Sequence, residues 1–267
     1  MGDPAHGEMP SVVGRYEIVA PLAEGGMGQI VLAHAGGAGG FKKRVVLKRL
    51  RPELATEAKY VRMLLDEARV LATLDHPNIV QVIDVVVEGG AVYLVMEYLS
   101  GWDARRLLNA ARKRPPGSAR PERTKGLPIE AALSIAMGAC AALAYAHAKT
   151  GDDGEPLAIV HRDISPGNIF VGVDGGVKVI DFGIARSTLK EHQTETGLVR
   201  GKVSYMSPEQ CRGAALDGRS DVFSLGVTLY ELVTGVLPHQ GEDDFDLRKA
   251  IVERPARSPG SYRLDLE

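Results

Sequence analysis

Short apolar runs separated by glycine-rich breaks fill the first hundred residues of this chain, and this pattern constrains its fold more than any other feature. Such runs are typical of β-strands joined by tight turns. One segment, Glu53–Leu74, interrupts them with apolar residues at helical spacing. We therefore expect five strands and one long helix. The expected strands are Tyr16–Leu22, Ile30–Ala35, Arg44–Leu50, Ile79–Val87 and Ala91–Glu97.

The remainder of the chain has mainly helical patterns. Helices are expected over Pro128–Lys149 and Ser220–Thr234, with two short strands between them, Ile169–Val173 and Val177–Ile180. Residues 1–13 are rich in Gly, Pro and small polar residues, so we expect a flexible tail. Strands first and helices afterwards indicate the α+β class.

Composition argues against several classes of protein. The formal net charge is −2, so no global basic field indicates a nucleic-acid partner. We expect no membrane span, because the most apolar helix is interrupted by Glu130, Ser134 and Gly138. No secretory signal is visible, and Cys140 and Cys211 lack metal-ligand spacing. Reduced thiols and a cytoplasmic location are the resulting expectation.

A glycine-rich stretch lies between the first two expected strands. It contains Leu22, Ala23, Gly25, Gly26, Gly28 and Ile30. Glycine lets backbone N–H groups approach phosphate oxygens closely, because no Cβ intervenes. A strand follows it and no Gly-Lys-Ser/Thr sequence closes it, so it is neither a Rossmann turn nor a Walker loop. A plain glycine hairpin is the alternative interpretation.

Lys48 ends an expected strand, a position where a lysine is usually solvated. Glu67 falls on the following helix, among apolar positions that face a core. A lysine held by such a glutamate can present its ammonium group to phosphate oxygens at a fixed point.

Two further motifs contain carboxylates and an amide, HRDISPGN at residues 161–168 and VIDFG at residues 179–183. Hard oxygen ligands such as those of Asn168 and Asp181 suit Mg²⁺. A second carboxylate, that of Asp163, can accept a hydroxyl proton. Each motif alone could be a turn with an Asp or Asn cap, but their combination and order indicate one site.

These motifs, with GGMG at residues 25–28 and YMSPEQ at residues 205–210, resemble the eukaryotic-type protein kinase family in its bacterial serine/threonine form. The resemblance extends from about Tyr16 to about Gly241. It implies a two-lobed kinase fold with a five-stranded N-lobe, a mainly helical C-lobe and ATP in the cleft.

The same resemblance implies lobe boundaries: an N-lobe over residues 14–97, a hinge over 97–101 and a C-lobe over 102–267 that ends early. It also implies ATP and Mg²⁺ as cofactors. Lys48, paired with Glu67, would bind the α- and β-phosphates. The nucleotide would also contact the glycine-rich stretch. Met96 would be the gatekeeper, and the backbone of the hinge residues Glu97 and Leu99 would contact the adenine. These nucleotide contacts would be Leu22, Ala23, Gly25, Gly26, Gly28, Ile30, Glu97 and Leu99.

Further roles follow from the resemblance. Asp163 would orient the substrate hydroxyl and accept its proton, and Asn168 and Asp181 would hold Mg²⁺. Asp221 would brace the catalytic loop, which comprises residues 161–168. Arg162 would sense a phosphate on the activation segment. The best acceptors there are Thr194 and Thr196, followed by Ser187 and Thr188; exposed loop hydroxyls with no such role are the alternative.

One departure from the family pattern concerns catalysis. Ser165 stands where the family normally has a lysine that neutralises the transferring phosphate. Lys202 stands where the family usually has a threonine beside that lysine. Our hypothesis is an exchange in which Lys202 supplies the missing charge.

A second departure is the short remainder after Pro238, with only one further helix expected, Asp243–Glu253. The family continues with helices that carry an arginine partner for the glutamate matching Glu209. A buried carboxylate that has lost its partner typically costs ~3–5 kcal/mol. A homodimer, a partner protein or a missing segment could cover this surface.

Three functions remain open from sequence. The leading one is a serine/threonine kinase acting on a protein substrate. A pseudokinase, which would bind nucleotide or partners without turnover, is the alternative motivated by Ser165. A small-molecule kinase is the third, although residues 207–209 (SPE) are associated with peptide substrates.

Overall fold

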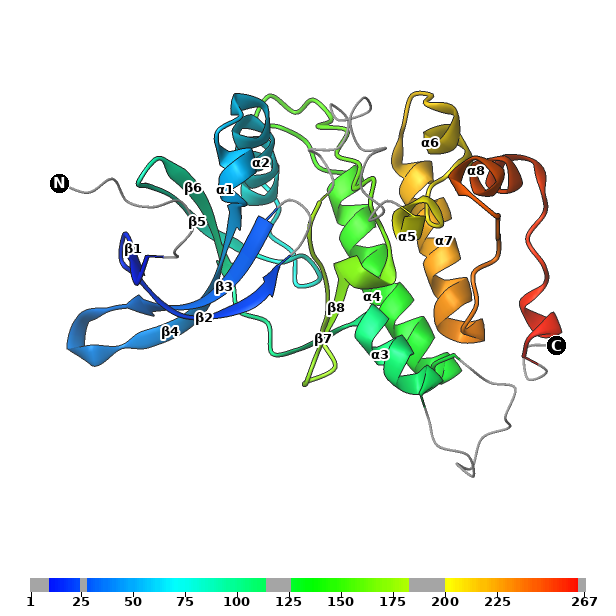
Figure 1. Cartoon of the computed structure of the whole chain (residues 1–267), viewed down its shortest axis with the longest axis horizontal. Coiled ribbons are helices and arrows are strands. Elements are labelled where there is room, and N and C mark those ends of the chain that lie inside the picture. Colours follow the sequence, from blue (N-terminus) through cyan, green and yellow to red (C-terminus); the bar gives the residue numbers. More distant parts are fainter. Residues whose placement is uncertain (1–9, 25–27, 114–125, 183–199, 264–267) are drawn as a thin grey trace. The chain divides into compact units, whose positions relative to one another are not determined.

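The computed structural model of this chain describes residues 10–24, 28–113, 126–182 and 200–263. The chain divides into two units (Figure 1). The first unit extends to Asp75 and resumes at Val80–Leu99. The second comprises His76–Ile79 and the chain from Ser100 onward.

An antiparallel sheet of six strands forms most of the first unit, in the order β1-β2-β3-β4-β6-β5. The strands are β1 (Val12–Val13), β2 (Tyr16–Glu24), β3 (Gly28–Gly36), β4 (Lys42–Leu50), β5 (Val82–Glu88) and β6 (Ala91–Glu97). Alternate residues of β4, such as Val45 and Leu47, are buried in one cluster with Tyr16, Val31 and Val95. Lys48 therefore points to the opposite side of β4 from this cluster.

The sheet contains one strand more than the five expected. Val12 and Val13 pair with Glu17 and Tyr16, and Val13 is fully buried. These two residues were expected in a flexible tail, because the Gly- and Pro-rich composition around them hides a two-residue strand. Pairing with β2, which is not a local property, recruits them to the sheet.

The single helix expected over Glu53–Leu74 is two helices, α1 (Pro52–Ala55) and α2 (Ala58–Ala72). Between them Glu57 has an extended backbone conformation (φ −95°, ψ 114°), which ends one helix before the next begins. The buried residues of α2 lie at helical spacing; they are Met63, Leu64, Glu67, Ala68 and Leu71. Glu67 is the charged member of this otherwise apolar face.

The second unit is mainly helical, as expected (Figure 1). Its helices are α3 (Ala104–Arg112), α4 (Ile129–His147), α5 (Arg200–Val203), α6 (Pro208–Arg212), α7 (Gly218–Thr234) and α8 (Asp244–Glu253). A small antiparallel sheet contains β7 (Gly101–Asp103), β8 (Ile169–Gly172) and β9 (Val177–Val179). Sequence analysis did not predict α3, whose basic residues obscure its short apolar face.

Helix α4 lies at the centre of the second unit, against α7 and β9. A Cβ on Gly138 would lie 2.6 Å from the Val177 side chain, so glycine permits the close approach of α4 to β9. With 19 residues, α4 is also long and apolar enough to cross a membrane. The polar interruptions noted in its sequence thus do not exclude a span by composition. Buried core helices meet the same criteria, so composition does not distinguish the two.

Two contacts in the C-terminal part of the second unit were not expected from the sequence. Ser220 donates its hydroxyl to Oε1 of Glu209 at 2.5 Å, so the expectation that Glu209 lacks a partner is wrong. Arg263 is 6% exposed, and its Nη1 donates to the carbonyl oxygens of Leu127 (2.7 Å) and Val233 (3.1 Å). Arg263 thereby links Leu127, just before α4, to Val233 in the last turn of α7.

Candidate active site

An ion pair in the first unit joins β4 to α2. Nζ of Lys48 lies 2.8 Å from Oε1 of Glu67, and their side chains are 19% and 8% exposed. An ammonium group carries three N–H donors, so this pairing can fix its position while it donates elsewhere. The predicted pairing of Lys48 with Glu67 is therefore present in the structure.

Four of the predicted nucleotide contacts, Leu22, Ala23, Gly28 and Ile30, lie on β2 and β3. Ala23 pairs with Ile30 across β2 and β3, one residue after Leu22. A Cβ on Gly28 would lie 2.6 Å from the carbonyl oxygen of Arg49, so the approach of β4 requires glycine there. Gly25 and Gly26 lie outside the described residues.

The predicted hinge begins at the end of β6. Met96, the predicted gatekeeper, is buried and pairs with Val46. The side chain of Glu97 accepts a hydrogen bond from the backbone N–H of Gln81 at 2.8 Å, and Leu99 is the last residue of the first unit.

Two predicted catalytic residues, Asp163 and Lys202, and the predicted metal ligand Asn168 come together in the second unit. Nδ2 of Asn168 donates to both the backbone oxygen (2.7 Å) and Oδ2 (2.8 Å) of Asp163. Nζ of Lys202 lies 3.1 Å from the same Oδ2, although the two residues are 39 positions apart. A short 3₁₀ turn at Pro166–Asn168 returns the chain towards Asp163. The exchange hypothesis requires this proximity of Lys202, and its role stays a prediction.

Asp221, in the first turn of α7, holds the backbone of the catalytic loop. It is fully buried and accepts hydrogen bonds from the backbone N–H groups of His161 and Arg162, both at 2.8 Å. Nε2 of His147 lies 2.7 Å from Oδ2 of Asp221. Arg162 has φ of 68°, a left-handed conformation that costs a non-glycine residue about 1–3 kcal/mol. The hydrogen bonds to Asp221 offset this strain.

His161 links the catalytic loop to the segment before Asp181. Its Nδ1 accepts from the backbone N–H of Asp163 (3.2 Å), and its Nε2 donates to the carbonyl oxygen of Ile180 (3.1 Å). Burial lowers the pKa of His161 below its usual value, against smaller opposing effects of Asp221 and Asp163. The histidine is therefore neutral with its proton on Nε2, the tautomer that this pattern needs.

Asn168 and Asp181 offer hard oxygen ligands close together. The backbone N–H of Ile180 donates to the carbonyl oxygen of Asn168 at 3.0 Å, which brings the following Asp181 beside Asn168. Both side-chain hydrogen bonds of Asn168 use its amide nitrogen and leave the amide oxygen for a metal. In the described part of the chain no three His, Cys, Asp or Glu residues cluster. The oxygen ligands of Asn168 and Asp181 fit Mg²⁺, which usually takes few protein ligands and completes its coordination with phosphate and water.

The sequence matches the protein kinase domain family over residues 16–260. The chain belongs to the protein kinase family. The expected bacterial eukaryotic-type relationship and kinase fold are therefore confirmed, and the family uses ATP and Mg²⁺.

Several relatives cover nearly all of this kinase. It is 43% identical over 254 residues to "Tyrosine-protein kinase MasK" of Myxococcus xanthus, covering 95% of this chain and 38% of that protein. It is 34% identical over 252 residues to "Serine/threonine-protein kinase PrkC" of Bacillus subtilis, covering 94% of this chain and 35% of that protein. The kinase thus spans about a third of the length of these curated relatives.

A solved structure has the same fold. The crystal structure of the Mycobacterium tuberculosis PknI kinase domain aligns with a TM-score of 0.66 and 26% sequence identity. The alignment covers 97% of this chain and 86% of that one.

Arg162, the predicted phosphate sensor, has a hydrogen-bond donor that could bind a phosphate. Nε of Arg162 is buried and has no hydrogen-bond partner among the described residues. The acceptors predicted on the activation segment, Thr194, Thr196, Ser187 and Thr188, lie outside those residues.

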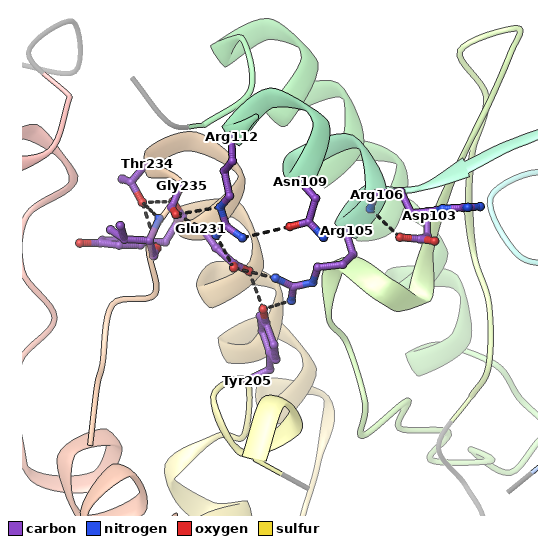
Figure 2. Close-up of polar contacts among 11 residues, drawn as sticks. Asp103, Arg105, Arg106, Asn109, Arg112, Tyr205, Glu231, Thr234 and Gly235 are labelled. Carbon is purple, nitrogen blue, oxygen red and sulfur yellow. Dashed lines mark hydrogen bonds and ion pairs between the residues drawn. The ribbon is translucent and has the colours of Figure 1, made fainter. Parts of the chain in front are cut away.

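A polar network between α3 and α7, centred on the buried Glu231, was not predicted from the sequence (Figure 2). Oε1 of Glu231 lies 2.7 Å from Nη1 of Arg105 and 2.9 Å from Nη2 of Arg112. The Tyr205 hydroxyl donates to Oε2 of Glu231 at 2.5 Å and also contacts Arg105. Burial raises the pKa of Tyr205 well above its usual value, and the negative charge of Glu231 adds a smaller effect in the same direction.

Two signals in the sequence could have indicated this network. Arg105 and Arg112 are seven positions apart, so they lie on the same face of a helix. Glu231 interrupts an apolar helical run, where a buried carboxylate needs a partner.

Proposed function

We propose that this kinase transfers the γ-phosphate of ATP to a serine or threonine hydroxyl of a protein substrate. The observation that carries the proposal is the convergence of Asn168 and Lys202 on the carboxylate of Asp163. A kinase without catalytic activity would have no chemical need both for this arrangement and for an intact Lys48–Glu67 ion pair.

Asp163 orients the acceptor hydroxyl and accepts its proton. The hydroxyl oxygen forms a bond to the γ-phosphorus as the bond from that phosphorus to the β–γ bridging oxygen breaks, and ADP leaves. Lys48, fixed by Glu67, binds the α- and β-phosphates. Asn168 and Asp181 would hold Mg²⁺, which supplies positive charge against the phosphates when it is bound.

Lys202 supplies the positive charge that Ser165 cannot. A charged contact made to the transferring phosphate is worth ~3 kcal/mol, or about a hundredfold in rate. We expect Lys202→Met to lower kcat by about this factor while ATP binding is retained. Adding Ser165→Lys to that variant should restore part of the rate, because the charge returns to the usual family position. Full activity of Lys202→Met would contradict the exchange.

Serine and threonine acceptors are supported by Pro166 and by residues 205–207 (YMS), and by relatives such as the one named a serine/threonine kinase. Tyrosine is the second candidate acceptor, because the relative with 43% identity is named a tyrosine kinase. Ser165 weakens the usual sequence discriminator between the two.

The test is phosphate transfer from labelled ATP with Mg²⁺, to the kinase itself and to peptides that differ only in a Ser, Thr or Tyr acceptor. Mass spectrometry identifies each modified residue, and Asp163→Ala is the matched control. Phosphate on Thr194 or Thr196 would in addition support the sensing role of Arg162. Well-folded protein that binds ATP but transfers no phosphate would instead support the pseudokinase interpretation.

A further inference from the structure

A pocket of about 310 Å³ opens beside the catalytic loop in the second unit. Its lining contains two cationic residues, Arg105 and Lys202; the other lining residues are Ser165, Gly167, Ser204, Tyr205 and Leu237. None of the residues that line it is acidic.

The pocket is continuous with the site of the proposed reaction. Lys202 lines it and also lies 3.1 Å from Oδ2 of Asp163. Ser165 and Gly167 follow Asp163 by two and four positions. An extended chain advances about 3.3–3.6 Å per residue. A peptide whose hydroxyl lies at Asp163 therefore brings a neighbouring side chain to this pocket.

The carboxylate behind the pocket does not attract cations. Glu231 is 2% exposed, and its oxygens bind Arg105, Arg112 and Tyr205 (Figure 2). Two guanidinium groups face this one carboxylate, so the network retains an excess positive charge. Its partners therefore neutralise Glu231, and the surplus charge lies on the arginines.

Arg105 carries that charge to the pocket. Its side chain lines the pocket and is 31% exposed. Arg112, the other arginine of the network, does not line the pocket. A guanidinium group has five N–H donors, and Arg105 uses two of its nitrogens towards Glu231 and Tyr205. The remaining donors suit a carboxylate, which guanidinium binds with charge-assisted hydrogen bonds.

We propose that this pocket selects protein substrates with an acidic side chain within about three residues of the acceptor, and that Arg105 determines this preference. The proposal rests on the proposed phosphotransfer, because it names the substrate class of the same site.

Matched peptides test the preference. Each contains one acceptor and carries Glu, Ala or Lys at one of the three positions on either side of it. A charge-assisted contact at a partly exposed site corresponds to about tenfold. We expect kcat/KM for Glu to exceed that for Ala by about this factor at one position, with Lys the poorest. Because the contact is partly exposed, the preference should weaken as salt is added.

Three variants at two arginines separate specificity from stability. Arg105→Gln should abolish the preference for Glu, and Arg105→Lys should retain part of it. Arg112→Gln removes the other arginine partner of Glu231 but touches no part of the pocket, so it should keep the preference.

The outcomes are distinguishable from failure of the proposed function. Equal transfer to the Glu and Ala peptides would overturn the pocket's role and leave the kinase activity intact. Loss of the preference in Arg112→Gln as well would assign Arg105 a structural role only. Fluorescence anisotropy of the labelled peptides measures the same preference as binding, even without turnover. Equal affinity there would also overturn the proposal.

Discussion

Two buried carboxylates lie ten positions apart on α7, and the protein satisfies them with different kinds of donor. Asp221 accepts hydrogen bonds from the backbone N–H groups of His161 and Arg162, and the side chain of His147 adds one further contact. Glu231 binds the side chains of Arg105, Arg112 and Tyr205 instead. Both carboxylates are at most 2% exposed.

The difference in donors separates two tasks. Backbone donors cannot be exchanged one at a time, so Asp221 fixes the path of the main chain through the catalytic loop. Side-chain donors can be exchanged singly, so the network around Glu231 can set the charge of a neighbouring pocket without changing that path. We therefore expect changes at Asp221 to affect every substrate and changes at Glu231 to affect the choice among substrates.

The largest effect is expected for Asp221→Ala. Two buried backbone N–H groups lose their acceptor, at about 1–3 kcal/mol each in the free energy of unfolding. The left-handed Arg162 also loses its restraint, so kcat should fall for all peptides alike. Urea unfolding and steady-state kinetics measure the two effects.

Asp217→Ala is the control, since Asp217 caps the same helix end through the backbone N–H of Arg219 without touching the catalytic loop. It should lower stability less than Asp221→Ala and leave kcat unchanged. An Asp221→Ala variant with normal kcat would show that the loop does not need this brace.

An intermediate effect is expected for Glu231→Gln. The variant keeps the shape of the side chain and removes the negative charge between two arginines. Because Arg105 and Arg112 are each about 30% exposed, water compensates part of the loss. We expect about 1–2 kcal/mol of lost stability, little change in kcat for a neutral peptide, and a stronger preference for acidic peptides. Loss of activity with every peptide would instead place Glu231 in the same class as Asp221.

The smallest effect concerns the pH dependence of stability through His161. Its pKa is lower in the folded protein than the ordinary value of 6.5. The unfolded chain therefore binds a proton first as the pH falls, and the folded state loses stability below about pH 6.5. A single proton contributes at most about 1.4 kcal/mol per pH unit. The slope of the unfolding free energy between pH 5 and 6.5 should be shallower in His161→Gln, and an unchanged slope would contradict the neutral assignment.

Local patterns predicted most strands, and they placed the candidate site residues Asp163 and Asn168 near each other, because each of these features is specified by residues close together in sequence. The alternation of apolar and polar residues in β4 predicted its buried face. The HRDISPGN motif contains both Asp163 and Asn168, whose side chains form a hydrogen bond. The approach of Lys202 to Asp163 was predicted across 39 positions only because Ser165 lacks the charge that the family pattern has at that position.

Features that depend on distant pairing could not be predicted in this way. The strand Val12–Val13 exists because β2 pairs with it. The contact of Arg105 with Glu231 joins residues 126 positions apart, and no motif marks either one. The hydroxyl of Ser220 binds Glu209, a contact that the family pattern does not suggest.

The hydrogen bonds of Arg263 set a practical boundary for work on this domain. Its guanidinium is buried against the carbonyl oxygens of Leu127 and Val233, and hydrogen bonds to a charged group are worth about 1.5–3 kcal/mol each. A shortened chain that stops before Arg263 would leave both carbonyl groups to find other donors. Expression vectors for crystallisation or screening should therefore extend past this residue, even though the family match ends at residue 260.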